Sequence, residues 1–587
     1  MTPRVILLIG AAVLLFVCPI VLSSSVVTTF NYIGLSGIVA LGLVILTGVG
    51  GLTSFGQAAF VGLGAYATAY LTTNYGISPW LALFASLAVA GVVAMILGFL
   101  TLRLAGHFLP LGTLAWAIGL YFLFGNLEML GGHTGIAKIP PVRLFDIALD
   151  TGVKFFYLNW TIVIVALIMV SNLLNSREGR AIYALKQGNV MVESMGVSSF
   201  RSKMIAFLVA ALLASISGWL YAHMQRFVNP TPFSLNYGIE YLFMAVLGGA
   251  GNVAGAFVGS TLVTVLRESL EDTLPSLIGH SGNFEIIVYG IVIVVLLQFA
   301  PQGLWPYFQK LLPTRKLAAP QGSASAFPVR VKPQRGSLIA RISEATKRFG
   351  GLVAVDKASF DLHAGEIVAL IGPNGAGKTT LFSLISGAAR LSGGRVEILG
   401  RSVQGMLPHD IAKLGISRTF QHVQLLPHMS VLDNVAIGAH MRGKSGVAAS
   451  ALRLNTGEEG RIFSTAVHQL EKLGLGDRWH IAAGALPLGE QRLLEIARAL
   501  AADPCLLLLD EPAAGLRHFE KQKLKDVLAG LRTEGIGILL VEHDMDFVMG
   551  IADRIVVLDF GVKIAEGQPA DIQRNAAVRE AYLGGVT

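Results

Sequence analysis

The chain has 587 residues, of which 53% are hydrophobic and 14% are charged, and its mean hydropathy is +0.63. These values exclude a wholly soluble protein and indicate that part of the chain lies in a membrane. The net charge of +8 comes from the first part of the chain: residues 1–312 hold 13 Lys and Arg against 10 Asp and Glu, residues 313–337 hold 5 against 0, and residues 338–587 hold 27 against 27. Because the C-terminal part has no excess of positive charge, we expect no nucleic-acid partner.

Residues 5–102 contain no Asp, Glu, Lys, Arg or His, which favours segments surrounded by lipid. Eight apolar segments are long enough to cross a bilayer, which takes about 20 residues. They are residues 5–22, 30–47, 55–72, 80–102, 108–125, 157–175, 203–224 and 284–304. We interpret the first as a retained span rather than a cleaved signal peptide, because residues 21–29 offer only a weak cleavage site and further spans follow directly.

The loop after the sixth span sets the predicted orientation. It carries five positive residues, Arg177, Arg180, Lys186, Arg201 and Lys203. Positive loops favour the cytoplasmic side, so residues 126–156 are expected outside. The later segment 239–266 is interrupted by GGAGN at Gly248–Asn252. We interpret it as a broken or re-entrant helix that returns to the side it left, so that residues 286–299 make the last inward crossing. A single kinked span is the alternative.

Residues 313–337 are rich in Pro, Ser, Ala and basic residues and have no apolar periodicity. This composition predicts a flexible linker whose Lys and Arg side chains lie near anionic membrane lipid. The linker separates a predicted transmembrane domain, residues 1–312, from a predicted α/β domain, residues 338–587.

The first motif of the C-terminal part is typical of a phosphate-binding loop. The strand pattern of Glu366–Ile371 leads into GPNGAGKTT, and an apolar helix pattern follows from Leu381. Glycines let backbone N–H groups surround an anion, while Lys378 can reach the β- and γ-phosphates and Thr379 can ligate Mg²⁺. The loop residues expected to bind nucleotide are Gly372, Pro373, Asn374, Gly375, Ala376, Gly377, Lys378, Thr379 and Thr380.

Polar residues follow other buried strand patterns. Residues 505–509 end in Asp510 and Glu511; the first carboxylate can hold Mg²⁺ through water, and the second can polarise the attacking water. Gln421 follows a strand-like segment and could reach the metal or that water. His543 follows residues 538–542, where a ring N–H could meet the γ-phosphate.

In this order the motifs of residues 338–587 resemble the ATP-binding subunits of ABC transporters, which have an α/β P-loop fold. The motifs are Phe349, GPNGAGKTT, Gln421, LPLGEQRLLEIARAL at residues 486–500, LLLLDEP at residues 506–512, and His543. The resemblance implies that Phe349 stacks on adenine, that Thr379, Gln421 and Asp510 ligate Mg²⁺, that Glu511 is the catalytic carboxylate, and that His543 senses the γ-phosphate of ATP. It also implies that two such domains pair head to tail, with Gly489 of the signature motif facing the partner's ATP.

Two residues depart from the family's pattern. Pro487 stands where the signature motif usually has a serine that contacts the partner's γ-phosphate, and Arg517 stands where many members have Asp or Asn. Pro suits a helix start, and helix N–H groups can still meet phosphate. Whether the partner's ATP site is weakened stays open, but the chain's own site has the residues needed to hydrolyse ATP.

The N-terminal part, residues 25–305, resembles permeases of the branched-chain (hydrophobic) amino-acid ABC importers, which are all-α polytopic membrane domains. The likeness rests on residues 42–71, 176–197 and 248–260. It implies that the positive loop after the sixth span docks on an ATPase domain in the cytoplasm, below the inner (plasma) membrane. It further implies a second permease subunit, a second ATP-binding subunit and a periplasmic solute-binding protein as partners.

The resemblance implies ATP-driven import by alternating access, with branched-chain or other hydrophobic amino acids as the solutes. Urea, short amides and aromatic acids are used by relatives and stay open. An ABC exporter is the less favoured alternative, because exporter spans usually continue into the cytoplasm as long charged helices, and none is visible in this sequence.

Overall fold

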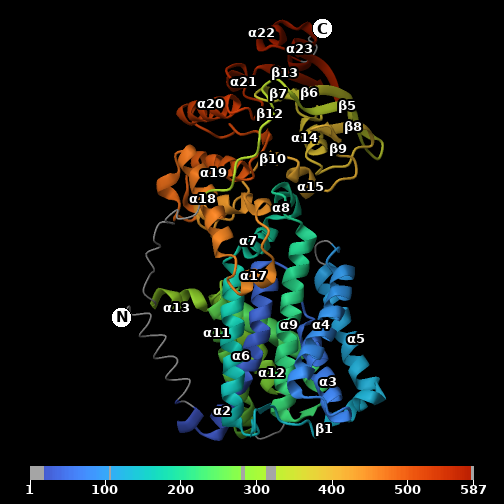
Figure 1. The fold of residues 1–587 in the computed structure, drawn as a ribbon, viewed down its shortest axis with the longest axis vertical. Coiled ribbons are helices and arrows are strands. Elements are labelled where there is room, and N and C mark those ends of the chain that lie inside the picture. The colour runs from blue at the N-terminus through green and yellow to red at the C-terminus, as the bar shows by residue number, and fades with distance from the viewer. Residues whose placement is uncertain (1–16, 18, 105–107, 279–283, 312–324, 584–587) are drawn as a thin grey trace. The chain divides into compact units, whose positions relative to one another are not determined.

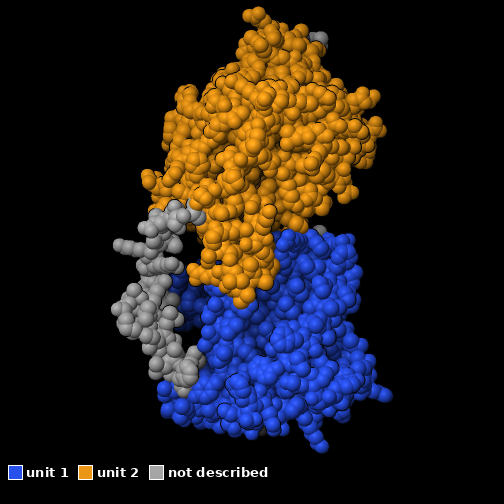
Figure 2. Space-filling view, in the orientation of Figure 1, with its two compact units in different colours: residues 1–175, 200–315 blue, residues 176–199, 316–587 orange. Residues whose placement is uncertain are grey.

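The computed structural model describes residues 17, 19–104, 108–278, 284–311 and 325–583. The chain forms two compact units (Figure 2). The helical unit comprises residues 1–175 and 200–315, and the α/β unit comprises residues 176–199 and 316–587. The division differs from the predicted domains at two places, because the positive loop 176–199 and the predicted linker residues 325–337 both belong to the α/β unit.

The helical unit consists of helices joined by short connections (Figure 1). They are α2 (Ser24–Leu43), which continues as the π-helix η1 (Val44–Val49), α3 (Gln57–Asn74), α4 (Pro79–Thr101), α5 (Phe108–Asn126), α6 (Gly152–Leu174), α9 (Ser199–Gln225), α10 (Leu235–Gly249), α11 (Val253–Ile278), α12 (Phe284–Phe299) and α13 (Trp305–Leu311). Two short strand pairs join its connections: β1 (Ile136–Ala137) with β4 (Phe227–Val228), and β2 (Arg143–Leu144) with β3 (Ile147–Ala148).

Among the described residues, six helices are long and apolar enough to cross a membrane: Ser24–Val49, Pro79–Thr101, Phe108–Asn126, Gly152–Leu174, Ser199–Gln225 and Val253–Leu270. Five of them match predicted spans. The predicted span 55–72 forms α3, an 18-residue helix that is not one of the six. The segment 284–304 forms the shorter α12, and the predicted span 5–22 lies almost wholly outside the described residues.

Large apolar side chains point outward from several of these helices. Phe84 on α4 is 68% exposed, Leu111 on α5 is 60% exposed, and Ile168 on α6 is 52% exposed. Many large apolar side chains exposed in this way are unfavourable in water. The helical unit therefore has the surface of a domain embedded in lipid.

The interrupted segment forms a helical hairpin. Helices α10 and α11 run antiparallel, because Gly248 approaches Gly255 while Met244 approaches Gly259. A Cβ atom on Gly248 would overlap the carbonyl oxygen of Gly255, and one on Gly259 would overlap that of Met244, so glycine allows the two backbones to touch. The predicted break is confirmed, and the alternative of a single kinked span is wrong because the chain reverses at residues 249–252. Residues 253–270 are nevertheless long and apolar enough to cross a membrane by themselves, so the return to the same side stays a prediction.

The α/β unit contains two sheets. Its six-stranded sheet has the order β10 (Ile416–Arg418), β11 (Leu506–Asp510), β12 (Gly537–Val541), β7 (Ile367–Ile371), β13 (Arg554–Asp559) and β14 (Val562–Gly567). The first five strands are parallel and β14 is antiparallel. A four-stranded antiparallel sheet has the order β6 (Leu352–His363), β5 (Leu338–Phe349), β8 (Gly393–Ile398) and β9 (Arg401–Ser402).

The strand patterns predicted around the polar motifs are confirmed as β7, β11 and β12. Each of these three strands is buried along its whole length, as expected for parallel strands that are covered on both faces. Because ligands of open α/β sheets bind beyond the carboxyl ends of the strands, the motifs that follow β7, β11 and β12 meet at one edge.

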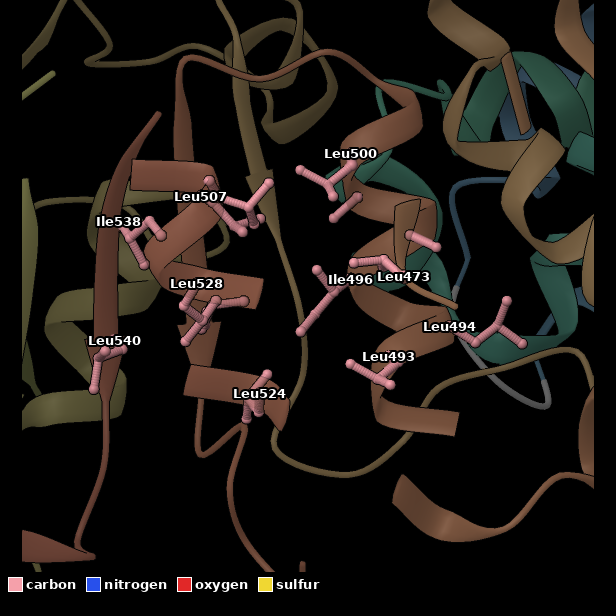
Figure 3. Packing of buried hydrophobic residues seen from close by; sticks show 14 of the residues in the cluster. Leu473, Leu493, Leu494, Ile496, Leu500, Leu507, Leu524, Leu528, Ile538 and Leu540 are labelled. Atoms are coloured by element: carbon pink, nitrogen blue, oxygen red, sulfur yellow. The ribbon is translucent and has the colours of Figure 1, made fainter. Parts of the chain in front are cut away.

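The remaining helices of this unit are α7 (Arg177–Ala184), α8 (Asn189–Ser194), α14 (Lys378–Ile385), α15 (Pro408–Lys413), α16 (Val431–Gly438), α17 (Val447–Ala451), α18 (Thr456–Lys472), α19 (Leu488–Ala501), α20 (His518–Thr533), α21 (Met545–Met549), α22 (Pro569–Arg574) and α23 (Ala576–Leu583). Leucine and isoleucine side chains of α19, α20, β11 and β12 form one buried cluster (Figure 3). This core fixes α19, the helix of the signature motif, against the sheet.

Residues 325–337 of the predicted linker form no helix or strand, but they lie on the α/β unit. The Phe327 N–H donates to Thr465 Oγ1 at 3.2 Å, and the Lys332 ammonium donates to Asp503 Oδ1 at 2.6 Å. The backbone N–H of Arg330 donates to the other oxygen of the Asp503 carboxylate. This part of the segment is docked, and residues 312–324 lie outside the described residues.

Replacing Gly259 by Ala should lower the thermal stability of the full chain in detergent, because the added Cβ would overlap the backbone of α10. We expect a cost of about 1–3 kcal/mol, typical of overpacking. Gly119→Ala is the matched control, since no atom lies within 4 Å of a Cβ at that position of α5. Equal thermal inactivation of the two variants would contradict the close hairpin.

Candidate nucleotide-binding site

The loop between β7 and α14 has the backbone of an anion-binding cradle. Gly372, Gly375 and Gly377 have φ angles of 150°, 82° and 92°, values that favour glycine over residues with a Cβ. A Cβ on Gly372 would overlap the carbonyl oxygen of Leu558, and one on Gly377 would overlap that of Ala354. The loop is therefore held against β13 and β6, and it leads directly into the N-terminus of α14, where N–H groups favour phosphate.

Lys378 is the first residue of α14, and its side chain folds back over the loop. The ammonium donates to the carbonyl oxygens of Gly372 and Pro373 at 2.7 and 2.8 Å. Burial lowers the pKa of Lys378, whereas the carboxylates of Glu511 and Asp510 raise it. The ammonium is thus placed within the electrostatic reach of both carboxylates and inside the phosphate-binding loop.

The two carboxylates lie at the end of β11 in different environments. Asp510 is 2% exposed, and burial raises its pKa despite the Arg418 guanidinium 3.6 Å away. Glu511 has a φ of 47°, while its N–H donates to the carbonyl oxygen of Val541 at 2.8 Å. This strained left-handed backbone at a strand end is the kind of outlier that collects at functional sites.

His543 and Glu511 are neighbours across the ends of β11 and β12. The distance from His543 Nδ1 to Glu511 Oε2 is 3.8 Å, and the imidazole is 65% exposed. The adjacent Glu542, which the sequence analysis did not select, is buried and accepts from the N–H groups of Ala513 at 2.6 Å and His543 at 3.2 Å. Burial raises the pKa of Glu542. A carboxylate ending a buried strand was the signal that could have identified it.

A pocket of about 480 Å³ lies beside the loop and is lined by Phe349, Thr379 and Thr380. Phe349 ends β5, is 53% exposed, and has the Lys347 ammonium 4.8 Å from its ring centroid. An exposed aromatic face at the rim of such a pocket can stack on a planar base. Asn374 at the tip of the loop is exposed, whereas Ala376 is buried.

Gln421 lies in the connection after β10, and its backbone is fixed by α19. The Arg492 guanidinium donates to the carbonyl oxygens of Phe420 and Gln421 at 2.9 and 2.6 Å. Glu495, one turn further along α19, accepts from the N–H of Gln424 at 2.8 Å and lies 3.4 Å from the Arg498 guanidinium. The ion cluster of Arg492, Glu495 and Arg498 thus holds this connection. Sequence reasoning missed these residues, although charges at i, i+3 and i+6 of an otherwise apolar helix were visible.

The signature motif occupies the start of α19. Pro487 is the N-cap residue, and its carbonyl oxygen accepts from the N–H of Gln491 at 2.9 Å. A Cβ on Gly489 would overlap Oε1 of Glu520, so α19 and α20 approach closely here. The Glu520 side chain accepts from the backbone N–H of Arg517 at 2.8 Å, which satisfies one donor at the start of α20. Gly489 is not among the residues that line the pocket beside Phe349.

The residue types present fit Mg²⁺. Thr379 is exposed in the first turn of α14, and Asp510 ends the neighbouring buried strand. A hydroxyl and a carboxylate are hard oxygen donors, and Mg²⁺ usually binds through one or two carboxylates together with phosphates and water. When bound, the ion would neutralise charge on the phosphates of the nucleotide.

A second site of the α/β unit holds the loop that precedes α9. Arg177 and Arg180 of α7 are 6% and 3% exposed. The Arg180 guanidinium donates to Glu459 Oε2 at 2.6 Å and lies 4.9 Å from the ring centroid of Phe463, while Glu459 Oε1 accepts from the Arg177 N–H at 2.6 Å. Glu459 lies in the first turn of α18, where the helix dipole favours negative charge.

The Arg177 side chain completes this site. Its guanidinium donates to the carbonyl oxygens of His440 at 3.0 Å, Gly443 at 2.5 Å and Ser445 at 2.6 Å. Planar guanidinium groups with several hydrogen bonds are suited to buried interfaces. Residues 187–191, which follow α7, line the same pocket as Phe349 and Thr379. The loop therefore reaches the edge of the candidate nucleotide site.

Comparison with known proteins agrees with this geometry. A family model described as the permease component of branched-chain amino acid transport systems matches residues 25–297, one for ABC transporters matches residues 355–514, and one for branched-chain amino acid ATP-binding cassette transporters matches residues 562–586. The branched-chain amino acid transport ATP-binding protein LivG of Salmonella typhimurium is 42% identical over 240 residues, which are 40% of this chain and 94% of that protein. BraF of Pseudomonas aeruginosa is 40% identical over 42% of this chain and 98% of that protein. A solved nucleotide-free ATP-binding cassette from an ABC transporter is 32% identical over 42% of this chain and 100% of that chain, with a TM-score of 0.39.

The α/β unit is thus an ATP-binding cassette with ATPase chemistry, and the helical unit is a membrane permease domain. The chain belongs to the branched-chain amino acid family of ABC transporters, and it carries permease and ATP-binding parts on one polypeptide.

Replacing Arg492 by Gln should destabilise the cassette, because two backbone carbonyls lose their donors and Glu495 loses a nearby positive charge. We expect the free energy of unfolding to fall by about 1–3 kcal/mol, and the ATPase rate to fall with it. The measurements are thermal inactivation of the full chain and its rate of phosphate release. The control is Arg395→Gln, whose exposed ion pair with Glu397 should contribute less than about 1 kcal/mol. If Arg492→Gln resembles the control, the cluster does not hold the connection around Gln421.

Proposed function

We propose that the chain is one permease half and one ATPase half of an importer that uses ATP to move branched-chain or other hydrophobic amino acids across the inner (plasma) membrane. The observation that carries the proposal is the packing of residues 176–199, a loop between two predicted membrane spans, into one compact unit with the cassette. The solute class is supported by the likeness of both the permease part and the cassette part to branched-chain amino acid transporters.

Within the cassette we assign roles by position. The loop Gly372–Thr380 binds the phosphates of ATP, with Lys378 on the β- and γ-phosphates, and Phe349 stacks on adenine. Thr379, Asp510 and Gln421 hold Mg²⁺. Support comes from the shared pocket of Phe349, Thr379 and Thr380 and from the burial of Asp510.

Glu511 orients the attacking water, and His543 binds the γ-phosphate. Their 3.8 Å separation allows both side chains to meet the same terminal phosphate. Glu542 positions this pair by holding the N–H groups of Ala513 and His543. Gly489 faces the ATP of a second cassette in a head-to-tail pair.

The transporter is completed by other subunits. One chain supplies one permease and one cassette, so a second of each is needed for paired ATP sites, and a periplasmic solute-binding protein delivers the solute. Closure of the cassettes on ATP moves α7 and, through the covalent connection into α9, biases the permease between its two states.

Lys378→Ala and Glu511→Gln should each reduce ATP hydrolysis and solute uptake by about 100-fold or more, because one removes the phosphate ligand and the other the group that orients water. The measurement is phosphate release and uptake of labelled leucine by the assembled transporter in proteoliposomes with its binding protein. Lys523→Ala, on the exposed face of α20, is the control. Normal uptake by either site variant would refute the assigned roles. Absence of uptake of leucine, isoleucine and valine by the wild type would refute the solute class.

Glu459→Gln should separate hydrolysis from transport. Loss of the carboxylate weakens the contacts with Arg177 and Arg180 but touches no residue of the phosphate loop. We expect basal ATPase to remain within about twofold of wild type, while stimulation by the loaded binding protein falls by about tenfold, as for a lost hydrogen bond to a charged group. Glu471→Gln, near the other end of α18, is the control. Full stimulation in Glu459→Gln would exclude this docking site as the coupling element.

A further inference from the structure

We propose that a polar cavity within the helical unit binds the solute as a zwitterion during its passage, with Arg267 holding the carboxylate and Glu268 the ammonium group. The inference rests on the proposed import function and adds to it a binding site and the charge state of the ligand. The cavity has a volume of about 270 Å³ and is bounded by side chains of α2, α3, α9, α10 and α11.

The cavity lies far along α9 from the loop that docks on the cassette. Ser199 begins α9, and the lining residues Ser217 and Tyr221 follow 18 and 22 positions later. At about 1.5 Å per residue, Tyr221 is about 33 Å along the helix from Ser199. The cavity therefore lies toward the end of α9 opposite to Ser199, which the predicted cytoplasmic position of the positive loop assigns to the outer side.

Charged side chains line this cavity although it lies among apolar helices. The Arg267 guanidinium lies 3.3 Å from Glu240 Oε2 and donates to the Tyr237 hydroxyl at 3.1 Å. The neighbouring Glu268 accepts from Thr29 Oγ1 at 2.6 Å. Ionisable residues within membrane helices are costly and mark solute or ion pathways.

The ion pair of Arg267 with Glu240 is not needed only to hold α10 and α11 together. These two helices already touch through the backbones of Gly248 and Gly259, and the Arg267 side chain, which lines the cavity, remains 39% exposed. A guanidinium offers a fork of donors that matches a carboxylate. Arg267 can therefore keep Glu240 as a positioning partner and bind a ligand carboxylate.

The remaining walls suit an apolar side chain. Phe233, Tyr241, Met244 and Val61 line the cavity together with Leu35. The volume corresponds to about nine water molecules at about 30 Å³ each, which is the scale of a single small solute. One cation, two carboxylates and an apolar wall match an amino acid, whereas urea or a short amide offers no charged group to Arg267 or Glu268.

The test measures binding of tritiated leucine to the full chain in lipid nanodiscs without nucleotide. Competitors are 3-methylbutylamine, which lacks the carboxylate of leucine, 4-methylpentanoate, which lacks the ammonium group, and acetamide. We expect each to compete about tenfold or more weakly than leucine, since each lacks a hydrogen bond to a charged group.

Arg267→Gln and Glu268→Gln should each weaken leucine binding by about tenfold or more. The first should bring 3-methylbutylamine close to leucine in apparent affinity, and the second should do so for 4-methylpentanoate. Lys154→Gln, which removes an exposed ion pair with Asp150 in the same unit, is the control and should bind like wild type. Thermal inactivation of each variant at the wild-type temperature verifies folding.

Three results would overturn the inference. The first is leucine binding at the wild-type affinity in both variants. The second is weaker binding with an unchanged order of the analogues, which is what a purely structural role of the two residues predicts. The third is that acetamide competes as well as unlabelled leucine. Leucine uptake by the assembled wild type separates the two proposals. If uptake is normal but the binding test fails, only the assignment of the cavity is refuted. If binding depends on Arg267 but no uptake occurs, the import function is refuted and the binding site is retained.

Discussion

The arginines of α7, buried on the acidic start of α18, are the constraint on which the functional interpretation depends. Arg177 and Arg180 would be unfavourable if buried alone. Terminal guanidinium nitrogens of Arg177 donate to a row of backbone carbonyls, and that of Arg180 donates to Glu459, which also accepts from the Arg177 backbone N–H. Because removal of one partner of a buried ion pair leaves the other charge uncompensated, the loop has a strong preference for the docked state. A segment that lies between two membrane spans in sequence thereby becomes part of the cassette.

The ATP site shows the same use of buried charge at a smaller scale. Arg492, Glu495 and Arg498 fix the connection around Gln421, and Glu542 fixes the turn beyond Glu511. These four side chains can affect the geometry of the site without contacting the nucleotide. The three charged side chains of α19 tie the connection around Gln421 to the helix whose first turn carries the signature motif.

In the helical unit, glycine and charge have complementary roles. Gly248, Gly255 and Gly259 let α10 and α11 touch, so the hairpin is held by backbone contact. Arg267 and Glu240 can then face a cavity instead of serving only to join the helices. A permease that must change state benefits from this separation, because the packing contacts can stay while the polar contacts are exchanged for those of a solute.

Sequence alone determined the local elements and the motifs. Apolar length specified most of the spans, and the order of strand, glycine loop and helix specified the phosphate-binding loop, since both signals lie within about 20 consecutive residues. The break at Gly248–Asn252 was visible for the same reason, but the reversal of the chain there required the contact between Gly259 and Met244. The docked segment 325–337 was unpredictable from composition, because its partners Thr465 and Asp503 lie well over 100 residues away. Only the tertiary structure decided that Arg177 and Arg180 lie on Glu459, that Glu542 supports His543, and that Arg267 lines a cavity with Tyr221. The contacts of Arg177, Arg180 and Arg267 join groups whose separation in sequence or orientation in space no local pattern encodes.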